Sequence, residues 1–252
     1  MLTRSPLCLP LVVSLVVLRA GLASAADDRI ERSFPYAPDM KITVRVTVGD
    51  VTISAWTRDE IAVEVVRRLP DDVGTERLPV HVELADGEVR IDAQQPSDGK
   101  DPLLRADVTL RVPSRAVLPD IDIFEGRLEL QGLAGLVTAK VERGAIAGRD
   151  VGGLLRLETT TGDIVLDAAE LTSEGLIRCR TFNGSVRIRL AKRPANARVL
   201  LLTLNGSITS DLPLSERPGF GPRFREATIG PGQYLISIDV VRGDIALNAP
   251  PR

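Results

Sequence analysis

The side chains able to carry chemistry are few and scattered along the chain. The 252 residues include one histidine, His81, and two cysteines, Cys8 and Cys179. A catalytic triad needs a histidine with a nucleophile and an acid, and zinc sites use several histidines or cysteines. His81 has no second histidine to join it, so we interpret it as an exposed surface residue. The sequence predicts no catalytic residue, no metal site and no cofactor.

Cys179 occupies a position that predicts burial. Apolar residues alternate with polar ones around it, and the equivalent positions of two other repeats hold Leu157 and Leu201. We therefore expect its side chain to lie in the core between these leucines, with Arg178 and Arg180 facing solvent. A buried thiol has a raised pKa and packs as a small apolar group, so it is a poor nucleophile.

Paired carboxylates offer the remaining catalytic hypothesis, because glycoside hydrolases use two acids that flank the scissile bond. Asp50, Asp163 and Asp244 each directly follow a repeated glycine. In the repeats on either side of Asp163, however, the same position holds Ala145 or Ser185. Adjacent repeats therefore share no acid, and a glycan-active β-helix enzyme is the least favoured function.

A repeated pattern gives the strongest structural signal. It is clearest in "TTTGDIVL" (159–166), "TFNGSVRI" (181–188) and "TLNGSITS" (203–210). Aligning the chain on its recurrent glycines gives successive spacings of 38, 39, 18, 18, 22, 22 and 37 residues. The aligned glycines, which we predict to be structural corners, are Gly49, Gly87, Gly126, Gly144, Gly162, Gly184, Gly206 and Gly243. A period near 20 residues is typical of stacked repeat architectures.

The residues around each glycine predict two strands joined by that corner. Apolar residues or threonine stand seven, five and three positions before the glycine and two after it, alternating with polar residues. Pro119 interrupts the first of these columns. Positions three before and two after are an odd number apart, so an unbroken strand would place them on opposite faces. The glycine resets the phase, because it adopts a sharp turn at little steric cost.

Two architectures satisfy this pattern. We predict an all-β fold, a β-solenoid with about 18–22 residues per central rung and hairpin-like capping strands at both ends. A stacked-hairpin β-sandwich is the alternative, since Asp86-Gly87 in "LADGEVRI" is typical of a two-residue hairpin.

The N-terminus predicts export. Arg4 precedes an apolar run from Leu7 to Leu18, and Ala23-Ser24-Ala25 fits a signal-peptidase site. We expect a signal peptide over 1–25 and one β-repeat domain over 26–252, destined for the periplasm, the cell surface or the medium. Within it, 26–118 holds N-terminal strands and hairpins, 119–211 the regular repeats, and 212–252 a loop and capping strands.

Charge excludes nucleic acid as a partner and suggests how the rungs align. Removal of Arg4 and Arg19 with the signal peptide leaves 30 basic side chains against 34 acidic ones, which gives no electrostatic basis for binding a polyanionic nucleic acid.

Outward positions alternate in sign, which predicts ion-pair ladders between stacked rungs. The two ladders are Lys140, Glu158, Arg180 and Arg149, Asp167, Arg189, Asp211. We interpret Arg178, Arg180, Arg187 and Arg189 as part of this mixed, solvated face.

One predicted strand lacks the polar outward face of the others. "RVLLLTL" (198–204) is apolar on both faces, with Leu200 and Leu202 pointing outward. Such a strand is usually covered. The segment 212–233, which carries Phe220 and Phe224, is the nearest candidate cover, and a partner protein is the alternative. We therefore mark Leu200 and Leu202 as a candidate partner patch.

The repeats resemble a known family. The segments "VTVGDVTISAW", "LRVPSRAVLPDIDIFEGRLELQGLAG" and the three quoted above are similar to the bacterial putative-adhesin family, also called the toast-rack domain. The resemblance implies an exported, repetitive β structure without assigned enzymatic activity. It favours a non-enzymatic adhesin or binding scaffold of the cell envelope. The alternative is an envelope-sensing or accessory subunit that works with a membrane partner. The partner itself, an envelope protein or a surface ligand, is unknown.

Overall fold

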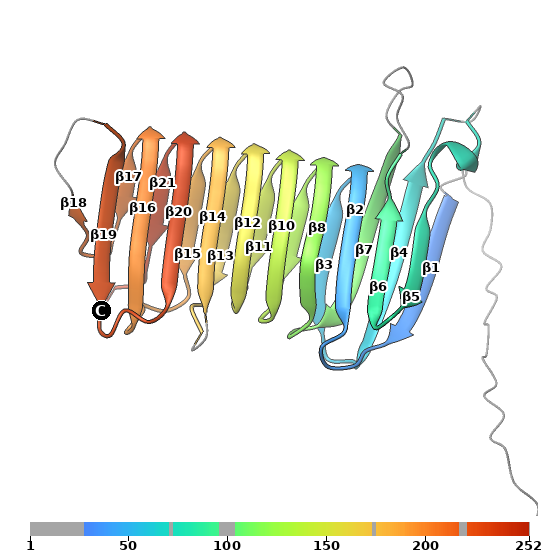
Figure 1. Ribbon diagram of the computed structural model, residues 1–252, viewed down its shortest axis with the longest axis horizontal. Helices are drawn as coiled ribbons and strands as arrows, with labels where there is room; N and C mark the ends of the chain where they lie inside the picture. The colour runs from blue at the N-terminus through green and yellow to red at the C-terminus, as the bar shows by residue number, and fades with distance from the viewer. Residues whose placement is uncertain (1–27, 71–72, 96–103, 173–174, 217–220, 252) are drawn as a thin grey trace, which may run out of the picture.

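The protein is built from two long β-sheets packed face to face (Figure 1). The computed structural model describes residues 28–70, 73–95, 104–172, 175–216 and 221–251. The expected signal peptide lies outside these ranges. So do Ala26, the expected first residue after its cleavage, and Phe220. Within them the chain forms strands and one short 3-10 helix, η1 (Thr75–Arg77).

Sheet A has ten strands and sheet B has eleven. In spatial order, sheet A comprises β1 (Asp28–Pro35), β4 (Glu60–Arg68), β7 (Arg105–Pro113), β3 (Val51–Trp56), β9 (Leu128–Gln131), β11 (Ile146–Arg149), β13 (Ile164–Ala169), β15 (Val186–Leu190), β21 (Ile245–Asn248) and β17 (Ile208–Ser210). In the same way, sheet B comprises β18 (Ser215–Glu216), β19 (Arg223–Ile229), β16 (Ala197–Asn205), β20 (Leu235–Arg242), β14 (Leu176–Asn183), β12 (Leu154–Thr161), β10 (Leu136–Arg143), β8 (Val117–Glu125), β2 (Lys41–Val48), β6 (Glu88–Ala93) and β5 (His81–Ala85).

The central strands form parallel, in-register rungs, which confirms the predicted β-solenoid. Each rung is one strand of sheet B followed by one strand of sheet A, as in β12–β13 and β14–β15. Antiparallel strands close the ends, with β4 and β1 on sheet A and β5 and β19 on sheet B. The stacked-hairpin sandwich does not describe these rungs, because consecutive rungs pair in parallel.

The predicted inward columns form the core between the sheets. In the β14–β15 rung, for example, Ile177, Cys179, Thr181 and Val186 are fully buried. Pro119 interrupts its column because the pairing of β8 with β10 shifts register there, and Leu118 packs inward instead with no exposed surface.

The corner glycines stack directly on one another, and this contact explains their repetition. A Cβ added to Gly184 would lie 1.9 Å from the carbonyl oxygen of Gly162, and one added to Gly162 would lie 1.9 Å from that of Gly144. Gly184 also has a φ of 153°, a conformation that side chains disfavour. Close approach between rungs, which the sequence did not indicate, is thus a second reason for glycine at the corner.

The recurrent threonine three residues before the glycine serves the same corner. The Thr181 hydroxyl donates a hydrogen bond to the Gly162 carbonyl oxygen at 3.1 Å, and Thr159 bonds Gly144 in the same way at 3.1 Å. Both side chains are almost fully buried. In the motif Thr-x-x-Gly, the glycine allows the two rungs to approach closely and the threonine bonds the glycine carbonyl of the adjacent rung. This bond satisfies the buried hydroxyl, which would be costly to leave unpaired.

Gly87 is not a corner between the sheets, so this prediction was wrong. It lies in the hairpin turn between β5 and β6, where Asp86 has a φ of 52° and Gly87 one of 76°. The two residues form the tight turn that an Asp-Gly pair favours. Since β5 is a capping edge strand, Leu84 is 41% exposed instead of buried as its column implied.

The order of rungs along the stack differs from their order in the chain at both ends. The last rung, β20–β21, lies between β14–β15 and β16–β17, and the first, β2–β3, lies between β8–β9 and β6–β7 (Figure 1). Cys179 is therefore flanked by Leu157 and Ile238, not by Leu157 and Leu201 as expected. The alternating pattern could not reveal this, because Leu201 and Ile238 are equally suited to the same column.

Candidate binding surfaces

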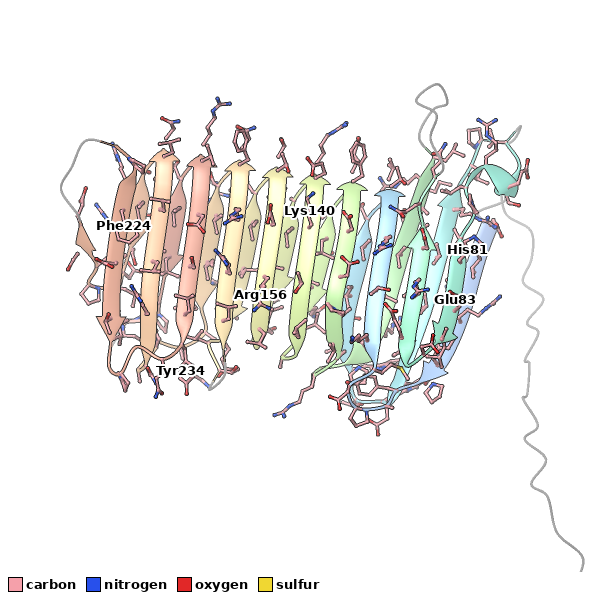
Figure 2. All side chains as sticks on the ribbon, viewed as in Figure 1. His81, Glu83, Lys140, Arg156, Phe224 and Tyr234 are labelled. Carbon is pink, nitrogen blue, oxygen red and sulfur yellow. The ribbon has the colours of Figure 1, made fainter. Side chains whose placement is uncertain are left out.

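The residues with catalytic potential do not converge in the structure. His81 is exposed on β5, opposite Asp92 of β6 (Figure 2). Cys179 is fully buried, and burial raises the pKa of its thiol to about 12. In the described ranges, no group of three or more histidine, cysteine or acidic side chains is arranged to hold a metal ion.

Asp163 and Asp244, which directly follow corner glycines, accept hydrogen bonds from backbone amides of adjacent rungs. Asp163 accepts a hydrogen bond from the Ser185 amide, and Ser185 in turn accepts one from the Asp244 amide. Asp244 then accepts bonds from both the amide and the hydroxyl of Ser207. These bonds lower the pKa of the Asp244 carboxyl. A serine thus separates the two acids, which act as hydrogen-bond acceptors.

A pair of neighbouring acids that the sequence did not indicate occurs at the N-terminal end of the stack. Asp107 of β7 accepts a hydrogen bond from the Asp50 amide at 2.9 Å. Arg105 bridges the two carboxylates, at 2.6 Å from Asp50 and 2.9 Å from Asp107, and Arg68 contacts Asp107 at 2.8 Å. Burial acts to raise the pKa of Asp107, but these hydrogen bonds and charges outweigh it and the pKa is lowered. Asp107 is therefore held ionised and is poorly suited to act as a general acid.

This network predicts an acid-dependent loss of stability. The lowered pKa of Asp107 stabilises the fold above the unfolded-state pKa of about 4, and this contribution is lost as pH falls through the folded-state pKa. We expect Asp107→Asn to cost about 1–2 kcal/mol at pH 7 and much less at pH 2. Chemical denaturation of both proteins across this range measures the difference. A constant difference at all pH values would contradict an ionised Asp107.

An open groove of ≈ 650 Å³ lies on the outward face of sheet A. Its centre holds the short side chains of Ala147 in β11 and Val165 in β13, which are neighbours on adjacent rungs. The longer side chains of Glu129 and Arg187 stand on either side of them in the same row. The hollow therefore arises because two small residues lie between two long ones.

Polar side chains line the groove along a second, parallel row. Gln131, Arg149, Asp167, Arg189 and Asn248 occupy equivalent positions on successive rungs of sheet A. Arg189 forms an ion pair with Asp167, as the sequence predicted. The groove thus presents amides, guanidinium groups and two carboxylates beside a small apolar floor, an arrangement suited to a polar ligand with hydroxyl groups.

The predicted charge ladders are partly correct. Lys140, Glu158 and Arg180 stand in register on adjacent strands of sheet B. Arg189 and Asp211, by contrast, are not neighbours, because β21 lies between β15 and β17. Asn248 of β21 pairs with Arg189 in register and donates a hydrogen bond to Asp211 at 2.9 Å.

The candidate partner patch is half-buried. Leu200 and Leu202 point outward from β16, and Leu202 lies opposite Phe224 of the neighbouring strand β19. Residues 223–229 extend sheet B at its edge and do not lie over the leucines, so the proposed covering by 212–233 is wrong for its described part. Leu204, at the corner end of the same strand, is 50% exposed.

Comparison with known proteins identifies the fold. No protein-family model matches the chain, and neither does any curated protein. Among solved structures, a "putative cell adhesion protein" from Clostridium sporogenes is similar over 88% of this chain and 100% of its own, with 12% identity and a TM-score of 0.50. The chain shares the fold of that protein. A "putative adhesin" from Bacteroides fragilis matches 88% of this chain and 98% of its own, with 11% identity and a TM-score of 0.38.

The likeness to the Clostridium protein confirms the fold that the repeats suggested. It covers 88% of the chain and all of the other protein. At 12% identity it extends to the architecture and not to individual side chains. In the described ranges, no helix is long and apolar enough to span a bilayer.

Proposed function

We propose that the protein is an exported, non-enzymatic binding scaffold of the cell envelope, of the adhesin type. The groove on sheet A carries this proposal. It lies open on a flat face, is lined by side chains of both charges, and crosses several rungs of one rigid stack. Such a surface can hold an extended polar ligand, whereas a catalytic site usually encloses its substrate.

Three further observations support the proposal. The first 25 residues have the composition of a signal peptide. The Clostridium protein that shares the fold is described as a "putative cell adhesion protein". The pair of acids Asp50 and Asp107 also favours binding over hydrolysis, since Arg105 and Arg68 hold Asp107 ionised.

The groove can be tested by filling it. Ala147→Trp places a large side chain at its centre, and Ala62→Trp, on the same face of sheet A but outside the groove, is the matched control. We expect the purified protein to bind peptidoglycan or cell-wall polysaccharide fragments by biolayer interferometry. Ala147→Trp should weaken binding about tenfold, equivalent to about 1.4 kcal/mol, and Ala62→Trp should not.

Three outcomes would contradict this proposal. They are an absence of binding to all the fragments, equal binding by wild type and Ala147→Trp, or shortening of the fragments on incubation. The last result would restore the enzyme hypothesis.

A second candidate function, an accessory subunit of a membrane partner, is favoured by the apolar end of β16. Leu204 is 50% exposed, and Leu200 and Leu202 continue the same outward face. Capture of a membrane protein from envelope extracts, lost in Leu204→Asp and retained in Ala147→Trp, would favour this function over the first.

A further inference from the structure

The outward face of sheet B carries a regular charge pattern with one interruption. In the row through Lys140, charges alternate in sign across seven adjacent strands. In spatial order they are Asp92, Arg45, Asp122, Lys140, Glu158, Arg180 and Asp239. Each cation in this row therefore has an acid on both sides.

The parallel row two residues earlier in each strand breaks the alternation. Arg156 of β12 and Arg178 of β14 are direct neighbours, with Thr138 before them and Ser237 after them. Like charges placed opposite each other on adjacent strands destabilise a sheet. Rungs that otherwise pair opposite charges thus bring two guanidinium groups together across a spacing of about 4.8 Å.

These arginines also lack the partners that other arginines of the same face possess. Arg45 contacts Asp120 at 3.0 Å, and Arg90 contacts Glu88 at 2.8 Å. Among the described residues, Arg156, Arg178 and Arg180 form no ion pair or hydrogen bond through their side chains. Their donors are therefore available to a ligand.

A shallow pocket of ≈ 340 Å³ lies at the same place. Lys140, Arg156, Arg178 and Arg180 line it, and Glu158 is the acid among them. Asp120, also at its edge, is already paired with Arg45. Figure 2 shows Lys140 and Arg156 on the sheet that faces the viewer, on adjacent strands.

We propose that this cluster binds a linear acidic polysaccharide, of the kind whose successive sugars carry carboxylate groups. Guanidinium groups bind carboxylates through paired hydrogen bonds, and Arg156 and Arg178 offer two such groups on adjacent rungs. A chain lying across the strands would meet Thr138, Arg156 and Arg178 in turn, so a hydroxyl group stands beside the two cations. Arg180 stands one row away and adds to the local positive charge, whereas Lys140 is paired with Glu142 at 3.3 Å.

The surroundings favour a narrow chain over an anionic membrane surface. Asp122, Glu158 and Asp239 lie in the adjacent row of the same face. A plane of anionic headgroups would meet these acids together with the arginines, whereas a single polymer chain can follow the arginine row. The site lies on sheet B and is separate from the groove on sheet A.

The test compares two double variants that remove equal charge from sheet B. Arg156→Gln with Arg178→Gln removes the unpaired arginines, and Arg45→Gln with Arg90→Gln removes two that have carboxylate partners. Titration with polygalacturonate oligosaccharides should show binding that weakens with salt. The first variant should bind about tenfold more weakly or worse, and the second less than about threefold. Ala147→Trp should leave this binding unchanged.

A thermal melt shows whether a loss of affinity reflects a loss of folding. Removal of a like-charged pair should leave the melting temperature of the first variant equal to, or above, that of wild type. The proposal is overturned if wild type does not bind the oligosaccharide or if both double variants lose affinity equally. Binding of vesicles containing anionic lipid, without binding of the oligosaccharide, would assign the cluster to a membrane instead.

Discussion

Gly184→Ala should cost the fold about 4 kcal/mol or more, enough to unfold many domains of this size. The added Cβ would lie 1.9 Å from the carbonyl oxygen of Gly162, which belongs to the backbone of the adjacent rung. Neither rung can move away freely, since each pairs in register with another rung on its far side. The φ of 153° adds strain of its own. Denaturant unfolding followed by circular dichroism measures the loss.

Gly87→Ala is the matched control for this prediction. Gly87 also has a positive φ, 76°, but a Cβ there would meet nothing within 4 Å. The substitution should therefore cost only about 1 kcal/mol, the conformational penalty alone. Equal losses in the two variants would show that φ, and not contact between rungs, selects the corner glycines.

Cys179→Asp is the second substitution that should abolish folding. The side chain is fully buried, and its two in-register neighbours, Leu157 and Ile238, are both apolar. A carboxylate there would have no partner and would cost several kcal/mol, whether it stayed ionised or took up a proton. We expect loss of soluble protein, or a loss of stability of about 4 kcal/mol or more.

Cys179→Val is the control, since it keeps an apolar side chain of similar size on a strand. It should cost less than about 1.5 kcal/mol. In the native protein the raised pKa and complete burial of the thiol should prevent alkylation, which should proceed once the chain is unfolded. Rapid labelling of the native protein would place Cys179 on the surface and reverse the inward and outward faces of its strand.

The sequence was informative about the two faces of each strand because burial imposes a strict alternation. Ile177, Cys179 and Val186 all lie inward as their spacing from Gly184 predicted. The glycine was correctly associated with a change of phase, but its contact with Gly162 depends on a neighbour from another rung. Local patterns describe one rung well and carry little information about its neighbours.

The order of the rungs shows this limit most clearly. Leu201 and Ile238 are interchangeable as core residues, so nothing in either strand specifies which of them stacks on Cys179. The outward charges do carry that information. Arg180 lies beside Asp239 in the observed order and would lie beside Leu202 if the rungs followed the chain. The charge ladder could therefore have indicated the insertion of β20, but only after the outward row had been extended to the last rung.

The candidate sites were missed for a related reason. The groove on sheet A depends on Ala147 and Val165, small residues that matter only because Glu129 and Arg187 flank them on other rungs. The sequence pattern alone places Arg178 on a mixed solvated face. Its neighbour Arg156 gives it a different environment, which only the register between β12 and β14 reveals.

The insertion of β20–β21 between two earlier rungs has a consequence for how the chain folds during synthesis. A nascent chain that ends at residue 211 has already made β14–β15 and β16–β17, yet these are not neighbours in the finished stack. They can be joined only when β20 and β21 have been synthesised and pair with both of them. Most solenoids propagate one repeat at a time, each stabilised by the repeat before it. In this protein β20–β21 is synthesised after both of the rungs that flank it, so this part of the stack is completed out of chain order, in a late step that joins β16–β17 to β14–β15.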